Sequence, residues 1–380
     1  MRLVYYEMKK LFNWKNILLI ILINIVMNYL FIDFHIKHFP NGRPILDEYH
    51  LSKEMIEKYG VSIDEKEFTD LKKWYENMVK QADQYIQSRE DFAHAGIRTY
   101  EDFRTADHSN DELRALHSQV MFTEQVDLFW KLEALEYIMG QYEKRDRWIK
   151  RLYEEVTPKQ EEKINQIIDS GTNQSILPWF VFENYNHIIK NVTIIIIVSI
   201  IVLLSPIYVS DKRNHVRLLQ YTSKKGRSVF TTKLMTALIS TFLLITVQLI
   251  GYFTIYSQNQ VHMFFASKVN SIFNYVQLWY DLSFFQYIVM TVVAIYLLGI
   301  ILSLIVCFIS SISSNYLMVI GMQVPIFLGL VGYLLKYLIE NVTTLRLPKY
   351  LAPSLYLALL FIGIIFMILR WKKEKVLDIV

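Results

Sequence analysis

Residues 190–211 read KNVTIIIIVSIIVLLSPIYVSD, with 20 uncharged residues between Lys190 and Asp211. A helix that crosses a bilayer needs about 20 mostly apolar residues, so this stretch is long enough to span a membrane. The sequence has four more runs of this kind, which hold 17 uncharged residues between Lys15 and Asp33, 34 between Lys233 and Lys268, 54 between Asp281 and Lys336, and 20 between Lys349 and Arg370. The sequence therefore predicts an all-α, polytopic membrane protein.

The 54-residue run is too long for one crossing. It is interrupted by a cluster of small polar residues between 310 and 315, which favours a turn between two helices. We therefore expect six transmembrane helices. Their predicted ranges are 16–33, 190–209, 234–257, 285–309, 316–338 and 351–369.

The composition agrees with a membrane protein. Hydrophobic residues make up 53% of the 380, charged residues only 20%, and the mean hydropathy is +0.24. Cys307 is the one cysteine, so neither an intrachain disulfide nor a cysteine-rich metal site can form. Aromatic residues are frequent in 258–285, which is typical of an interfacial or partly re-entrant stretch.

Basic residues near the span ends predict the orientation. Residues 1–15, 210–233 and 370–380 together carry 15 Lys and Arg against four Asp and Glu. Because positively charged flanks stay in the cytoplasm, we expect both termini to be cytoplasmic in a multi-pass protein of the plasma membrane, of bacterial type. This orientation divides the chain into residues 1–33, with an elbow helix and the first span, an extracytoplasmic domain at 34–187, and spans two to six at 188–380.

The predicted extracytoplasmic domain has the pattern of a helical domain. Ser62–Glu65 and Ser109–Glu112 resemble capping boxes, and they would open long helices to about Ala93 and Tyr153. Thr157 precedes a proline and would start a further helix that stops at Gly171. We expect three to five helices in a bundle or a long hairpin.

No catalytic or metal-binding pattern is present in the sequence. His35, His38, Asp47 and His50 lie close together, but their spacing matches no zinc site and favours solvated side chains over metal ligands. We therefore expect no enzyme activity and no cofactor in this chain. The domain could sense a ligand or guide a substrate, and it could equally be a spacer or a dimer contact.

Several polar residues lie inside the predicted spans. Asn24 and Asn28 share one face of the first span, while Gln248 and Gln323 lie near the middle of the third and fifth. These side chains, with Pro325, indicate either interhelical packing or a translocation path. The span centres carry no full charge, which argues against an ion-coupled pump, so energy for transport would come from elsewhere.

Residues 210–233 form a predicted cytoplasmic segment with a distinctive pattern. Asp211-Lys212-Arg213 is followed by RLLQYTSKKGR at 217–227, and Lys233 enters the third span. With the basic amphipathic N-terminus and the six spans, this segment resembles the ABC-2-type permeases, which are membrane subunits of ATP-binding cassette exporters. The resemblance assigns contact with the ATPase to Asp211, Arg217, Leu218, Leu219, Tyr221, Lys224, Lys225, Gly226 and Arg227.

The resemblance implies a permease that exports an amphipathic substrate such as a lipid or a peptide antibiotic. A separate cassette ATPase dimer would bind ATP and Mg, because this chain has no Gly-x-x-x-x-Gly-Lys-Ser/Thr loop. A second permease chain, identical or different, and membrane lipid are the other expected partners, and nucleic acid is not expected. The competing hypothesis is a membrane receptor or signalling scaffold whose outer domain binds a ligand.

Overall fold

The computed structural model describes residues 2–151, 156–214, 216, 226–340 and 342–376. Among these residues the secondary structure is helical, and no β-strand is formed beyond two isolated bridges. Six helices are long and apolar enough to cross a membrane. This confirms the predicted all-α class and the predicted number of candidate spans.

The observed spans are mostly longer than the predicted ones. The six run over Trp14–Phe31, Trp179–Arg213, Val229–Asn259, Phe284–Ile312, Tyr316–Leu334 and Leu351–Val376. The largest difference is at Trp179, where the second helix starts 11 residues before the predicted beginning at 190. Polar residues of its first turns, such as Asn184, are buried against other parts of the protein, so hydropathy alone placed the start too late.

The residue contacts divide the chain into two compact units. Unit 1 comprises residues 1–37, 184–260 and 286–380, and unit 2 comprises 38–183 and 261–285. The helices that lie in unit 1 wholly or for the most part are α1 (Arg2–Leu11), α2 (Trp14–Phe31), α3 (Asp33–Lys37), α12 (Trp179–Leu204), α13 (Pro206–Arg213), α15 (Val229–Tyr256), α16 (Phe284–Ile312), α17 (Tyr316–Gly329) and α18 (Leu351–Val376).

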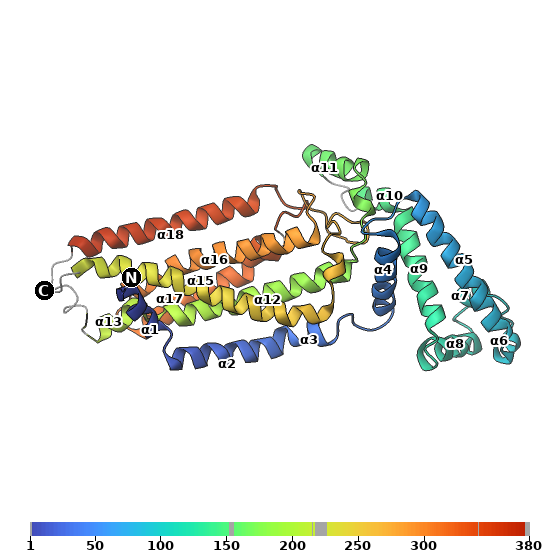
Figure 1. The fold of residues 1–380 in the computed structure, drawn as a ribbon, viewed down its shortest axis with the longest axis horizontal. Coiled ribbons are helices and arrows are strands. Elements are labelled where there is room, and N and C mark those ends of the chain that lie inside the picture. The colour runs from blue at the N-terminus through green and yellow to red at the C-terminus, as the bar shows by residue number, and fades with distance from the viewer. Residues whose placement is uncertain (1, 152–155, 215, 217–225, 341, 377–380) are drawn as a thin grey trace. The chain divides into compact units, whose positions relative to one another are not determined.

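The long helices of unit 1 run lengthwise beside one another (Figure 1). Helix α15 contacts α1, α13 and α18, which makes it a common partner for both ends of the chain. Helix α17 stays α-helical across Pro325 and then continues as two π-helical turns, Leu330–Leu334 and Lys336–Glu340. Such π-helical turns are rare, and they often mark functional regions of a helix.

Unit 2 contains more and shorter helices than the three to five that we predicted. They are α4 (Ile45–Tyr59), α5 (Glu65–Gln87), α6 (Glu90–His94), α7 (Tyr100–Arg104), α8 (Asp111–Ser118), α9 (Asp127–Glu143), α10 (Arg145–Arg151) and α11 (Pro158–Asp169). The helical stretch predicted from residue 109 to about 153 is divided into α8, α9 and α10 in its described part. Gln125 has a φ of 51°, which interrupts the helical backbone before α9. The Trp130 indole stabilises this conformation by donating a hydrogen bond to the Met121 carbonyl.

Local capping signals predicted two helix starts well. Helix α11 starts after Thr157 as predicted, where Thr157 and Gln160 form a capping box, and Gly171 follows that helix with a φ of 67°. At α5 the box is formed by Asp64 and Glu67, two residues later than the predicted pair. Ser62 instead forms an isolated β-bridge with Ser175, so its backbone is extended there and does not cap the helix.

Residues 261–285 belong to unit 2, although they lie far from its other residues in sequence. The Ser271 hydroxyl donates a hydrogen bond to the Ser175 carbonyl at 2.5 Å, and the Ile272 amide donates to the Asn173 carbonyl at 2.8 Å. Phe264 and Phe273 are buried there. The aromatic residues of this segment that we assigned to a membrane interface therefore contribute in part to the core of this unit.

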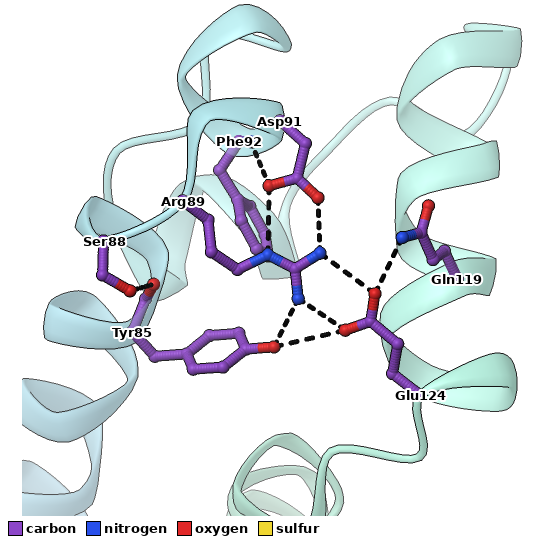
Figure 2. A network of polar contacts seen from close by, with 7 residues as sticks. All are labelled: Tyr85, Ser88, Arg89, Asp91, Phe92, Gln119 and Glu124. Atoms are coloured by element: carbon purple, nitrogen blue, oxygen red, sulfur yellow. Dashed lines mark hydrogen bonds and ion pairs between the residues drawn. The ribbon is translucent and has the colours of Figure 1, made fainter.

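Polar contacts link the residues just after α5 to the segment that precedes α9 in unit 2. Arg89, just after α5, contacts both Asp91 and Glu124, and Gln119 donates a hydrogen bond to the same Glu124 carboxylate (Figure 2). These contacts lower the pKa of Glu124 to about 2. The guanidinium thus links the end of α5 to the segment that precedes α9.

Close packing between α15 and α16 depends on Gly299. A Cβ atom at this position would lie 2.4 Å from Ile245 Cδ1 and 3.3 Å from Thr241 Cγ2. At Gly321 of α17, in contrast, a Cβ atom would meet no described atom within 4 Å. Among the described residues, Gly321 is therefore not a point of close helix contact as Gly299 is.

We predict that Gly299→Leu destabilises the protein by about 1–3 kcal/mol, because the added side chain overpacks the contact with α15. Gly321→Leu is the matched control, since the same change there meets open space. Thermal unfolding of the two variants in detergent measures the difference. Equal midpoints for both variants would contradict the packing described here.

Candidate functional site

The two ends of segment 210–233 meet in a buried ion pair. Asp211, near the end of α13, lies 2.6 Å from the Lys233 ammonium in the first turns of α15, measured from Oδ2 to Nζ. The exposed fractions are 8% for Asp211 and 3% for Lys233. Residues that are 22 positions apart in sequence are therefore joined directly at the base of this segment.

Helix α1 supplies two more charges to the same cluster. Glu7 is only 4% exposed, and its Oε2 lies 3.5 Å from Lys233 Nζ. Lys10 contacts Glu7 at 2.6 Å and Asp211 at 3.8 Å. Burial opposes the charge of Lys10, but the contacts with both carboxylates outweigh it and raise its pKa. We call these four residues the base cluster; it balances two acids with two amines.

The local sequence explains why α1 presents Glu7 inward. Glu7 and Leu11 are the buried residues of this helix, and they are one helical turn apart. Lys9 and Tyr6 lie on other faces and are exposed. Helix α1 then ends before Asn13, whose side chain caps α2 by accepting a hydrogen bond from the Asn16 amide. The amphipathic helix predicted at the N-terminus is thus confirmed, with an acid on its buried face.

Lys233 has further partners in α13. Its ammonium donates a hydrogen bond to the Ile207 carbonyl at 2.5 Å and lies 5.5 Å from the centre of the Tyr208 ring. Tyr208 in turn donates its hydroxyl hydrogen to the Phe230 carbonyl at 2.8 Å. A buried ammonium is stable only when ion pairs and hydrogen bonds replace its water, and Lys233 has both.

Helix α16 continues to Ile312, so Ser310 and Ser311 of the predicted turn lie in its last helical turn, and they extend this connection to α16 and α18. The Ser310 hydroxyl donates to the Ser205 carbonyl and accepts from the amides of Tyr208 and Val209. The Ser311 carbonyl accepts a hydrogen bond from Arg370 of α18 at 3.1 Å. From sequence we had predicted only a polar turn here; the contacts are between distant residues, and no local pattern indicates them.

Of the residues predicted to contact an ATPase, the structure describes only those near the two ends of the segment. Asp211 lies in the base cluster, and Gly226 begins the 3₁₀ turn Gly226–Ser228, with a φ of 47°. Arg227 lies in the same turn. The other six predicted residues lie outside the described part of the chain: Arg217, Leu218, Leu219, Tyr221, Lys224 and Lys225.

The structure brings two of the predicted intramembrane residues together. Gln248 of α15 donates hydrogen bonds to Asn24 Oδ1 of α2 at 2.9 Å and to the Ser199 hydroxyl of α12 at 2.8 Å. Tyr252 also donates to Asn24 Oδ1, at 3.1 Å. These amides therefore join three helices, which is a packing role within this chain.

Gln323 makes a separate contact. Its Oε1 accepts a hydrogen bond from Ser205, at the junction of α12 and α13, at 2.9 Å. Pro325 lies two residues further along the same helix. The side-chain oxygen of Asn28 has no hydrogen-bond partner among the described residues, so Asn28 does not join the network around Asn24.

No group of His, Cys, Asp or Glu side chains that could hold a metal ion is found in the described residues. Comparison with known proteins gives no match to a family model, to a curated protein or to a solved structure. The geometry of the site is therefore the basis for assigning a function.

We predict that Lys233→Met destabilises the protein by about 3–5 kcal/mol, because it leaves buried carboxylates without a counter-charge. Adding Asp211→Asn to Lys233→Met should restore part of this loss, since it removes one of those carboxylates. Lys9→Met, at an exposed lysine of α1, is the control and should change little. Thermal or denaturant unfolding in detergent tests the series. A loss equal to that of Lys9→Met would disprove the structural role of the base cluster.

Proposed function

We propose that this chain is the membrane-spanning permease subunit of an ATP-driven exporter of the ABC-2 type. The observation that supports it best is the base cluster, which joins both ends of segment 210–233 to the amphipathic helix α1. A segment fixed at both ends can transmit a displacement, whereas a free loop would absorb it. A partner that pushes on this segment would therefore move α13, α15 and α1 together.

In this proposal the energy comes from a separate cassette ATPase dimer, which binds ATP and Mg. The chain has no phosphate-binding loop of its own. Hydrogen bonds of Ser310 and Ser311 would pass a movement of α13 on to α16 and α18. The export substrate would be amphipathic, such as a lipid or a peptide antibiotic, and a second permease chain would complete the pathway.

Unit 2 favours a second candidate function, a receptor or signalling scaffold. This unit has its own core, built on α4, α5 and α9, which would allow it to bind a ligand by itself. The two candidates differ in their partners. Co-purification of a cassette ATPase from native membranes supports the permease, and its absence supports the receptor.

The proposed orientation has unit 2 outside the cell and segment 210–233 inside. In a Cys307→Ala background, we predict that Ser88→Cys reacts with an impermeant thiol reagent on intact cells and that Ser223→Cys does not. Ser88 is exposed at the end of α5, whereas Cys307 is buried. Equal labelling of the two positions, with the cells verified as intact, would refute this orientation.

We predict that the double variant Leu218→Ala/Leu219→Ala reaches the membrane but no longer co-purifies with its ATPase or stimulates ATP hydrolysis. Apolar residues of a docked amphipathic helix anchor it, and each core-like truncation costs on the order of 2–5 kcal/mol. Simple attraction of the basic segment to anionic lipid depends on charge and would survive this change.

The matched control for this experiment is Leu18→Ala/Leu19→Ala in α2. These adjacent leucines are 57% and 45% exposed, and they lie in a candidate span. We expect this control to retain ATPase association. Normal association in the Leu218/Leu219 variant would show that the coupling site lies elsewhere.

A further inference from the structure

A small cavity lies inside unit 2 and has the chemistry of a binding site. Its volume is about 10 Å³, which is enough for one group of the size of a water molecule. The lining combines one carboxylate with aromatic, apolar and neutral polar side chains. The residues that matter here are Glu48, Ser52, Met55, Gln141, Trp179 and Phe273.

Glu48 is the charged residue of this lining. It is half-buried on α4, and among the described residues its carboxylate has neither a hydrogen-bond nor an ion-pair partner. Burial, together with the nearby carboxylate of Glu133 on α9, raises the pKa of Glu48 to about 7. A cation stabilises a carboxylate in this situation, and in the described part of the chain no basic side chain forms an ion pair with Glu48.

The aromatic rings of the lining favour the same kind of ligand. Trp179 and Phe273 both face the cavity, and the Tyr275 ring lies 6.0 Å from the Trp179 ring. The π faces of such rings attract cations, Trp most strongly. Ser52 and Gln141 add a hydroxyl and an amide to the lining, and Met55 adds an apolar side chain.

We propose that this cavity binds a primary alkylammonium group, with Glu48 as the counter-ion and Trp179 and Phe273 as the aromatic walls. An ammonium group is about the size of a water molecule, so it fits the volume, whereas a quaternary ammonium does not. Its three N–H donors can be shared between the carboxylate and the neutral polar groups. The site lies wholly in unit 2 and does not depend on the proposed transport role.

The test uses the full chain in nanodiscs of phosphatidylcholine, a zwitterionic lipid that does not attract cations by net charge. Ligand-observed NMR titrations compare n-butylammonium with n-butanol and tetramethylammonium, with empty nanodiscs as the blank. We expect saturable binding of n-butylammonium at least about tenfold tighter than that of either comparison compound. Equal affinity for n-butylammonium and n-butanol would overturn the proposal, and this comparison requires no variant.

Glu48→Gln should weaken n-butylammonium binding by about tenfold or more. The control is Glu57→Gln, at an exposed residue of the same helix, which should bind as the unmodified chain does. Affinity unchanged in Glu48→Gln would also overturn the proposal.

The pH dependence gives a second readout that a purely structural role of Glu48 would not produce. The titratable groups that face Glu48 are Glu133 and Tyr137 of α9. Because the Glu48 pKa is raised to about 7, its carboxylate is mostly protonated at about pH 5.5 and mostly ionised at about pH 8.5. We expect tighter binding at the higher pH in the unmodified chain and a flat profile in Glu48→Gln. A flat profile in the unmodified chain would contradict the role of Glu48.

Discussion

The contact on which unit 1 depends most is the buried ion pair between Lys233 and Asp211. An ammonium at 3% exposure is stable only with a counter-charge, because removing one partner of a buried pair costs several kcal/mol. This requirement fixes the start of α15 against α13, and Glu7 extends it to α1. The ion pairs therefore hold together three helices that are separate in sequence at this end of the unit.

The rest of the helix packing follows from a related constraint. Between apolar helices in lipid there is no hydrophobic driving force, so close packing and a few hydrogen bonds determine which faces meet. Gln248 and Asn24 provide such a contact, as do Thr241 and Ser303, whose hydroxyls are 2.6 Å apart. The close approach at Gly299 acts in the same way by allowing α15 and α16 into contact.

The sequence predicted the features that depend on neighbouring residues. Apolar run length and the polar residues at 310–315 identified the six candidate spans, and Thr157 followed by a proline marked the start of α11. It could not predict features that arise between distant segments. Residues 261–285 join unit 2 through contacts with Ser175 that leave no periodic pattern. The pairing of Lys233 with Glu7 could not be predicted either. In the sequence, Glu7 is one of several charged residues of an amphipathic helix, and only the structure shows that it is buried.

The presence of charged rather than apolar residues in the base cluster needs a physical reason. A buried ion pair is often no more stable than apolar residues of the same size, so stability alone does not explain its presence. The ion pairs also fix which helices meet, because Lys233 contacts carboxylates of both α13 and α1. Segment 210–233 contains both members of this pair, Asp211 in α13 and Lys233 in α15. In the proposed coupling, a displacement of the segment would carry α13, α15 and α1 together as long as the cluster stays intact.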